Sequence, residues 1–535
     1  MSQVEAPVTG PGPAAAQPGP AARGQAAVAW LGRLAGRHWL AAGLLAAGLV
    51  LRVLAQLAYR PALFYIDSAR YLYNAGGMDP VGYKGPLRAI LFVANFDTVA
   101  AVQHLLGLGM AVLLYALLLR RGVPRWLAAL AVAPVLLDAY QLQIEQMVMP
   151  DVWFEALIVA GLAVLLIRRV PMPGMRAVTA AGVVLGTSAT VRQVGEILIL
   201  PGLAYLVAVG GPWRDTVSRL AVFFLAFIAP IGAYMAGSLL VSGHFWLDSA
   251  TPSLSSYGRM ATAADCATLH IPSYERPLCP TARQRANGID WLDHDTASPL
   301  KSYVAPPGMN RYSVIASFDQ QVMLQQPARV IAAIAADGAN LFRSGRTAEQ
   351  DGTAISRWQF QTSYPSYSSW VMVGKNGTIT FGLRLQPGSP VITRHRLDPS
   401  YGGRAQVDKP VASFLRSYQL GGGYTPGPLL ALLGLAGLAG SVLVLARRAP
   451  QARHQAALGC LLFFGTGIAV LAISDAYQFS WRYQLPALVT LPPAGVLGIT
   501  AVLTYLRRRG ADPVARSDEV PDERGLSQTP TASGV

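Results

Sequence analysis

An acidic residue and three cations that could act on a phosphorylated substrate stand in one stretch, YIDSARYLYNAGGMDPVGYKGPLR, at 65–88. Asp67 could take a proton from a hydroxyl group as a general base. Arg70, Lys84 and Arg88 could bind a phosphate through charge-assisted hydrogen bonds. Each residue also has a structural interpretation. Asp67 could cap a helix or pair with Arg70, and cations beside a membrane often attract anionic lipid headgroups.

Two further acids, Glu145 and Asp151, lie in the short apolar segment QLQIEQMVMPDVWFE. Acids at a membrane surface are costly unless something pairs with them. They could orient a substrate, or hold a divalent cation that bridges to a phosphate. Alternatively, they could form salt bridges with loop cations or be solvated. The cofactor is therefore unknown, with a divalent cation as one possibility. Asp138, farther upstream, is a weaker candidate.

Two arginines stand in turns between apolar runs, Arg192 in GTSATVRQVGE and Arg482 in SWRYQLP, where Tyr483 follows. These side chains could contact the phosphate of a lipid carrier. The structural alternative is that they reach along the membrane to the headgroups. His244 and the run 293–295 show no partner at zinc-ligand spacing, so a zinc site is not predicted there.

The elements that position these residues are apolar helices. The chain has 535 residues, of which 52% are hydrophobic and 13% charged, against about 25% charged residues in soluble proteins. A helix of about 20 apolar residues crosses a bilayer. Ten ranges are predicted to span the membrane: 38–59, 98–119, 126–141, 152–168, 177–190, 195–210, 218–242, 427–446, 456–474 and 487–506. The predicted fold class is an all-α polytopic membrane protein.

Arginine clusters set the predicted orientation. They occur at 120–121, 168–169, 447–448 and 507–509, which all fall on one side if the N-terminus is cytoplasmic, as the positive-inside rule requires. Both termini are then cytoplasmic and the protein lies in the cell membrane. The net charge of +15 is spread over these clusters rather than gathered on one face, which argues against nucleic-acid binding.

The predicted domains are a disordered tail at 1–37, a transmembrane core at 38–242 with a catalytic first outer loop at 60–97, an extracellular domain at 243–425, C-terminal transmembrane helices at 426–507 and a disordered tail at 508–535. The extracellular domain is expected to be α+β. Asn376-Gly377 between two strand-like runs predicts a type I′ hairpin, and an apolar helical pattern is interrupted near Pro327. An extracellular location favours a disulfide between Cys266 and Cys279.

Several motifs in order suggest a family. They are an outer-loop Asp67 after the first span, Gly-Tyr-Lys-Gly-Pro-Leu before the second, Asp151 before the fourth, Ser-Ala-Thr-Val-Arg-Gln between two close spans, and Trp-Arg-Tyr-Gln-Leu-Pro before the last. Together they resemble the bacterial GT-C membrane glycosyltransferases, the group of the protein O-mannosyltransferases and the aminoarabinose transferases of lipid A. The resemblance covers roughly 38–242 and 475–506. The sequence departs from it in two places: many relatives have a second acid where Ser68 stands, and an acid or His where Lys84 stands.

The resemblance implies transfer of a sugar from a polyprenyl-phosphate donor to an acceptor at the outer face of the membrane. Asp67 would be the catalytic acid of the first loop and Asp151 the second acid. Arg192 and Arg482 would contact the carrier phosphate. We expect an inverting displacement with Asp67 as general base and a glycan, lipid or protein as acceptor. Two alternatives stay open: a lipid-glycan-binding or envelope-assembly protein without catalysis, and a transporter of lipid-linked sugars.

Overall fold

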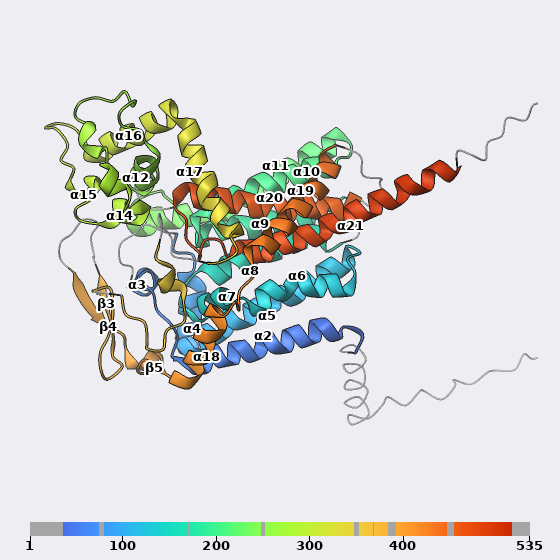
Figure 1. Cartoon of the computed structure of the whole chain (residues 1–535), viewed down its shortest axis with the longest axis horizontal. Helices are drawn as coiled ribbons and strands as arrows, with labels where there is room; N and C mark the ends of the chain where they lie inside the picture. The colour runs from blue at the N-terminus through green and yellow to red at the C-terminus, as the bar shows by residue number, and fades with distance from the viewer. Residues whose placement is uncertain are drawn as a thin grey trace, which may run out of the picture.

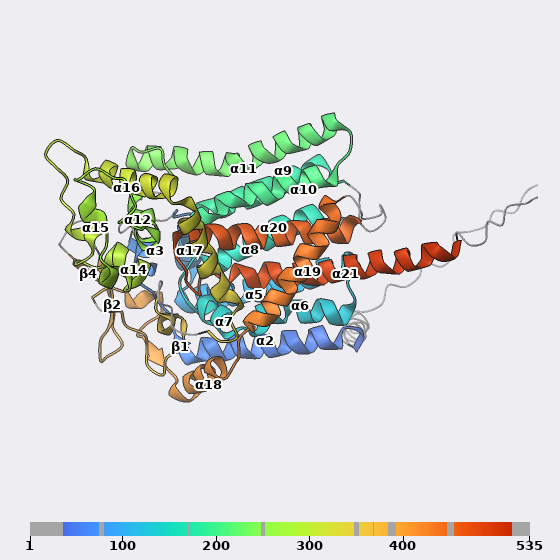
Figure 2. The same ribbon diagram turned by 45° about the horizontal axis from the view of Figure 1, so that its top comes forward.

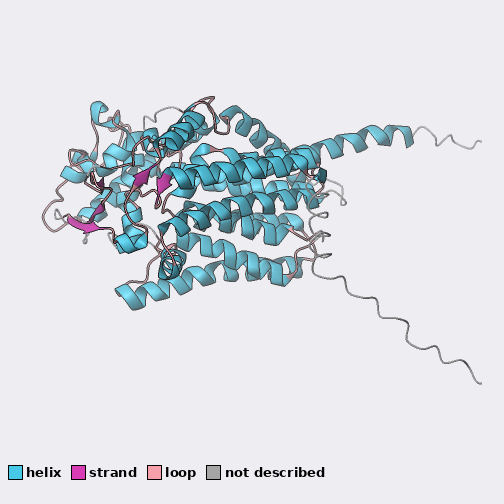
Figure 3. Ribbon diagram, turned by 90° about the horizontal axis from the view of Figure 1, so that it is seen from below, coloured by secondary structure: helices cyan, strands magenta, loops and turns pink. Residues whose placement is uncertain are grey.

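The protein is mostly helical in a computed structural model (Figures 1 and 3). The structure describes residues 36–73, 80–168, 172–247, 252–346, 353–367, 369–383, 392–446 and 454–515. Most of the two predicted tails, 1–37 and 508–535, therefore lies outside the described residues, although the last helix runs on to Ala515.

A bundle of apolar helices forms the body of the protein. It contains α2 (Trp39–Ala58), α5 (Phe96–Arg120), α6 (Arg125–Leu137), α7 (Ala139–Gln146), α8 (Asp151–Leu166), α9 (Met175–Val191), η1 (Gln193–Leu198), α10 (Ile199–Val209), α11 (Trp213–Ser242), α19 (Gly427–Leu445), α20 (His454–Tyr477) and α21 (Pro486–Ala515). Figure 2 shows α11, α9, α20, α21 and α2 running alongside one another. Each of the ten predicted spans overlaps one of these helices.

The length of the helices supports fewer membrane crossings than the ten predicted, and the count of ten stays a prediction. Among the described residues, six helices are long and apolar enough to cross a membrane, or seven if α6 and α7, which bend by 49° at their junction, count as one span. The shortfall from ten comes from short helices such as α8, whose 16 residues rise only about 24 Å, less than the ~30 Å of a hydrocarbon core. The chain is a multi-pass membrane protein.

Outside the bundle, a group of short helices has its own hydrophobic core. These are α12 (Pro252–Ala263), η2 (Arg276–Leu278), α13 (Ala282–Arg285), α14 (Gly288–His294), α15 (Pro299–Ser302), α16 (Arg311–Gln325) and α17 (Pro327–Ala339). Tyr257, Leu292, Phe318 and Val330 lie in this second core. The pattern that predicted a helix interrupted near Pro327 is confirmed, because α16 ends at Gln325 and α17 begins at Pro327.

The rest of the predicted extracellular region packs on the bundle instead. It contains η3 (Asn340–Phe342), η4 (Ile355–Trp358), β2 (Val371–Val373), β3 (Ile379–Leu383), β4 (Thr393–Arg396), η5 (Pro399–Tyr401), β5 (Gln406–Val407) and α18 (Lys409–Leu420). Trp358, Phe381 and Leu415 belong to the same hydrophobic core as the bundle helices. The predicted range 243–425 therefore holds two packing units, a helical one with its own core and a strand-containing one that continues the main core.

The strands form two small antiparallel sheets. β2, β3 and β4 make one, and β1 (Tyr59–Arg60) pairs with β5 in the other. The hairpin predicted at Asn376-Gly377 is present, because Val373 pairs with Ile379. Its connection is not the two-residue turn that we predicted: it spans 374–378, closed by Gly374 N–H donating to the Thr378 carbonyl at 2.8 Å. Gly377 adopts a φ of +75° in this loop.

The two packing units of the range 243–425 gather at one end of the bundle. Figure 1 shows α12 to α16 and the strands at this end, while the start of α2 and the end of α21 lie at the other. The segments next to Asp67 and Arg482 lie at the same end, because Tyr65 contacts Arg357 and the Asp475 carbonyl accepts from Arg259.

Candidate functional site

The segment after α2 is fixed against the connection between α7 and α8. Leu63 N–H donates to the Gln146 carbonyl, and Val148 N–H donates to the Leu63 carbonyl, each at 2.9 Å. The pairing of β1 with β5 holds the same segment from its other side. Asp67 comes just before α3 (Ser68–Tyr73). Because of these contacts, it lies close to the start of α8, where Asp151 is located.

Ser68 stabilises the turn that contains Asp67. It is fully buried, its hydroxyl donates to the Val148 carbonyl at 3.0 Å, and it accepts from Tyr65 N–H at 2.9 Å. An ionised carboxylate could accept but not donate. The serine therefore suits this position in a way that a second acid would not.

Ser68→Ala is expected to lower the free energy of unfolding by about 1–3 kcal/mol, because it leaves a buried carbonyl and a buried N–H without partners. Titration of the purified protein with a denaturing detergent measures this loss. Ser273→Ala is the matched control, since Ser273 is exposed and its replacement should change the stability little. Equal stabilities of the two variants would contradict this role of Ser68.

Two acids and two arginines meet beside α3 and α8. Arg482 donates to Asp67 at 2.9 Å, and its Nε lies 3.6 Å from Asp151. Arg192 forms an ion pair with Asp151. Arg70, on the other side of Asp67, is 3.8 Å from that carboxylate. The structure thus brings Asp67, Asp151, Arg192 and Arg482 together from four separate parts of the sequence.

Aromatic rings surround the arginines of this cluster. The guanidinium carbons of Arg192 and Arg482 lie 5.0 and 4.8 Å from the centre of the Tyr483 ring. Arg482 also lies 5.2 Å from the ring of Trp358 and 5.8 Å from that of Tyr65. These distances are typical of cation–π contacts. The rings hold the guanidinium groups while leaving them charged.

A pocket opens at this cluster, which we call the charged pocket. It is small and is lined by Asp151, Phe154, Glu155, Arg192, Val194, Val470, Ser474, Arg482, Tyr483 and Pro486. Asp67 contacts the pocket through its hydrogen bond to Arg482. The lining therefore combines two guanidinium groups with two carboxyl groups, a set that could bind the phosphate and the hydroxyls of one ligand.

The charge of Asp67 depends on its neighbours. Burial by itself would raise the pKa of Asp67, but the Arg70 and Arg482 guanidinium groups outweigh it, and the pKa lies below the ordinary value of 3.8. The carboxylate is therefore ionised at neutral pH and ready to accept a proton. Burial and the charge of Asp67 raise the pKa of Tyr65 to about 12, which keeps that phenol neutral.

Glu145 does not line the charged pocket. It is fully buried between helices, where Arg52 donates to it at 2.7 Å and His104 Nδ1 lies 2.9 Å from its other oxygen. Asp138 likewise has a structural position, since it caps α7 and pairs with Arg346 at 2.8 Å. Glu145 thus forms a salt bridge, as one of the two interpretations allowed, but with Arg52 of helix α2 rather than with a loop cation.

Lys84 and Arg88 stand on α4 (Lys84–Val93), and neither belongs to the described residues that line the charged pocket. Lys84 is half-buried and Arg88 is exposed. Burial, with a smaller effect of Arg88, lowers the pKa of Lys84 to about 8. The loop before α4 approaches the site, because Gly82 N–H donates to the Thr190 carbonyl at 2.9 Å. A side chain at Gly82 would collide with that carbonyl.

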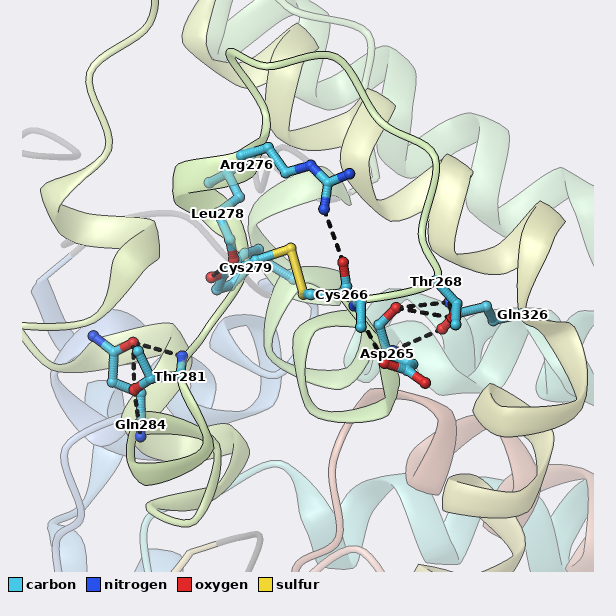
Figure 4. The surroundings of a disulfide bond; sticks show 11 residues. Asp265, Cys266, Thr268, Arg276, Leu278, Cys279, Thr281, Gln284 and Gln326 are labelled. Atoms are coloured by element: carbon cyan, nitrogen blue, oxygen red, sulfur yellow. Dashed lines mark hydrogen bonds between the residues drawn. A yellow bond between two sulfur atoms is a disulfide. The ribbon is translucent and has the colours of Figure 1, made fainter.

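The two cysteines of the outer region are joined. Figure 4 shows the disulfide between Cys266 and Cys279, with Arg276 donating to the Cys266 carbonyl at 2.8 Å. The disulfide lies in the helical unit and contributes nothing to the charged pocket. No group of three or more His, Cys, Asp or Glu side chains that could hold a metal ion occurs within the described residues.

Sequence reasoning missed Glu155 and Trp358, as well as five other residues that line the pocket, Phe154, Val194, Val470, Ser474 and Pro486. Glu155 follows Asp151 by one helical turn in α8, and an acid inside an apolar run is a signal of function that could have identified it. Trp358 comes from η4, in a segment without a recognisable motif. Nothing in the sequence indicates that it covers Arg482.

No known protein family and no curated protein matches the chain. Among solved structures, it is similar to the archaeal oligosaccharyltransferase AglB from Archaeoglobus fulgidus in complex with an inhibitory peptide and a dolichol-phosphate, at 12% identity and a TM-score of 0.38, over 92% of this chain and 53% of that chain. A second structure of the A. fulgidus enzyme, tethered to an acceptor peptide, gives 12% identity and a TM-score of 0.37 over 91% and 52%. The chain spans about half the length of these structures, and the similarity is distant.

Proposed function

We propose that this protein is a membrane glycosyltransferase that moves a sugar from a polyprenyl-phosphate donor to an acceptor hydroxyl at the outer face of the cell membrane. The observation that carries the proposal is the charged pocket, where Arg192 and Arg482 meet two acids at one end of a bundle of apolar helices. A polyprenyl chain would lie in the bilayer beside the bundle and present its phosphate at this level. The acceptor is a glycan, lipid or protein.

The reaction would be a single inverting displacement. Asp67 takes the proton of the acceptor hydroxyl as its oxygen forms a bond to the anomeric carbon of the sugar. The bond between that carbon and the phosphate oxygen breaks, and its electron pair leaves with the polyprenyl phosphate. Arg192 and Arg482 stabilise the negative charge that grows on the departing phosphate. The proton thus goes to Asp67 and the charge to the leaving group.

Arg482 would couple donor binding to the basicity of Asp67. In the structure, this guanidinium group pairs with both Asp67 and Asp151. A donor phosphate that binds Arg482 competes with the two acids for its N–H groups. Because a cation lowers the pKa of a nearby carboxyl, sharing Arg482 with the phosphate raises the proton affinity of Asp67. The base would then become stronger only when the donor is present.

The proposal is tested by transfer in proteoliposomes that contain the full chain, labelled undecaprenyl-phosphate sugars and a cell-envelope extract as acceptor. We expect labelled, acceptor-linked sugar with the wild type. Binding of these donors without any turnover would support the non-catalytic alternative instead. Movement of intact donor between leaflets without transfer would support a transporter. Absence of any donor binding would contradict all three functions.

The pH dependence of transfer should follow Asp67. Because its pKa is lowered, activity should be kept while the pH stays above that pKa and lost as the pH falls through it. We expect kcat/KM to stay flat from about pH 7 down to about pH 5. Arg70→Gln removes one of the cations that lower this pKa and should move the acid limb to higher pH. An acid limb that moves lower, or not at all, would contradict the assignment.

A further inference from the structure

Glu155 differs from the other acids at the charged pocket in its partners. It is fully buried and lines the pocket, yet none of the ion pairs found among the described residues includes it, whereas Asp67 and Asp151 both pair with arginines. Gln141 Nε2 donates to Glu155 Oε2 at 2.7 Å. The second oxygen, Oε1, is buried without a hydrogen-bond partner.

Gln141 fixes the direction in which Glu155 points. The same amide nitrogen of Gln141 lies 3.4 Å from Glu145, which Arg52 and His104 hold in turn. The carboxyl of Glu155 is therefore anchored by one oxygen to a rigid group inside the bundle. Its other oxygen, on a side chain that lines the pocket, has no hydrogen-bond partner among the described residues.

A buried carboxyl oxygen without a partner is costly unless something binds it. A phosphate already has two guanidinium partners in the pocket lining, Arg192 and Arg482, so we assign the free oxygen of Glu155 to a different group of the ligand. A hydroxyl group can donate to the carboxyl. In a glycosyl phosphate, hydroxyls lie on the sugar ring, next to the phosphate. The pocket thus has a cationic part for the phosphate and an acceptor for the sugar.

We propose that Glu155 recognises a ring hydroxyl of the donor sugar and so makes the charged pocket prefer a glycosylated polyprenyl phosphate to the bare carrier. This role rests on the proposed function, and it assigns recognition of the sugar to Glu155. It also gives the donor a direction in the pocket, with its phosphate at Arg192 and Arg482 and its sugar at Glu155. After transfer, the bare carrier lacks the hydroxyl contact and is released more readily.

The test measures equilibrium binding to the purified full chain, without any turnover. The probes are undecaprenyl phosphate and its mannosyl, galactosyl and arabinosyl derivatives. We expect the wild type to bind at least one glycosylated probe roughly threefold to tenfold more tightly than the bare carrier, the range of an ordinary hydrogen bond. Glu155→Ala should remove this preference, so that the glycosylated probes and bare undecaprenyl phosphate bind with equal affinity.

Two further variants complete the test. Glu155→Gln has nearly the same shape and can still meet a hydroxyl, so it should keep part of the preference, and it serves if Glu155→Ala does not fold. Glu196→Gln is the matched control, because Glu196 is exposed near Arg192 and is not part of the pocket lining; it should bind as the wild type does.

Three outcomes overturn a claim, and they are distinguishable. If Glu155→Ala keeps the preference for the glycosylated probe, Glu155 does not recognise the sugar. The same conclusion follows if the wild type binds bare and glycosylated carriers equally. If the wild type binds none of the four probes, the proposed donor class itself is wrong.

Discussion

Asp67→Asn is expected to lower the rate of sugar transfer by about 10²–10⁴-fold, the usual contribution of a general base. Asparagine has nearly the same shape as aspartate but cannot take the proton of the acceptor hydroxyl. Insertion and folding should be kept, because Arg482 still has Asp151 at 3.6 Å as an anionic partner. The rate is measured in a single turnover with labelled undecaprenyl-phosphate sugar in proteoliposomes, so that product release does not mask the chemical step.

Asp97→Asn is the matched control for Asp67→Asn. Asp97 lies in the first turn of α5, which begins at the same end of the bundle, and it is not part of the charged pocket. This variant should transfer sugar at the wild-type rate. Near-wild-type transfer by Asp67→Asn would reduce Asp67 to a structural partner of Arg482. A loss of donor binding in Asp67→Asn would mean that the variant disturbs the pocket rather than the proton transfer.

The sequence predicted the types of the site residues and their positions next to the ends of helices better than their pairing. Asp67, Asp151, Arg192 and Arg482 each follow or precede an apolar run, so a common end of the bundle could be deduced. That Asp67 pairs with Arg482, 415 positions away, depends on how the helices pack. Local patterns carry no such information.

Glu145 shows where local pattern reasoning fails. Glu145 and Asp151 lie in the same apolar segment, and the sequence allows the same two interpretations for both. The structure separates them, because Glu145 is on α7, which turns into the bundle, and Asp151 begins α8 at the pocket. The turn depends on the break at Asp138 between α6 and α7, where Asp138 caps α7 by accepting from Tyr140 N–H at 3.0 Å. The acid residue was visible in the sequence, but its role as a cap was not.

The partner of Glu145 explains why the bundle tolerates a buried acid. Arg52, on α2, donates to Glu145 and also to the Val135 and Leu136 carbonyls at 3.0 and 2.9 Å. These carbonyls are at the end of α6, where the last carbonyls of a helix lack intrahelical donors. Gly107 makes room for the group, since a methyl there would lie 2.7 Å from Arg52 Nη2. The Arg52 guanidinium group thus forms an ion pair with Glu145 and also donates hydrogen bonds to the carbonyls at the end of α6.

Arg52→Leu and Glu145→Leu are each expected to lower the free energy of unfolding by about 3–5 kcal/mol, because each leaves an uncompensated charge between helices. The double variant should lose less than the sum of the two, since it removes both charges, but it should stay below the wild type because the Val135 and Leu136 carbonyls lose their donor. Titration with a denaturing detergent measures all three. Strict additivity of the two Leu variants would show that Arg52 and Glu145 do not act as a pair.

The subtler variant Glu145→Gln keeps the shape and should raise the KM for the lipid-linked donor much less than Glu155→Ala does, because Glu145 reaches the charged pocket only through Gln141. A KM raised as much as by Glu155→Ala, in a variant that stays folded, would return Glu145 to the substrate-binding residues.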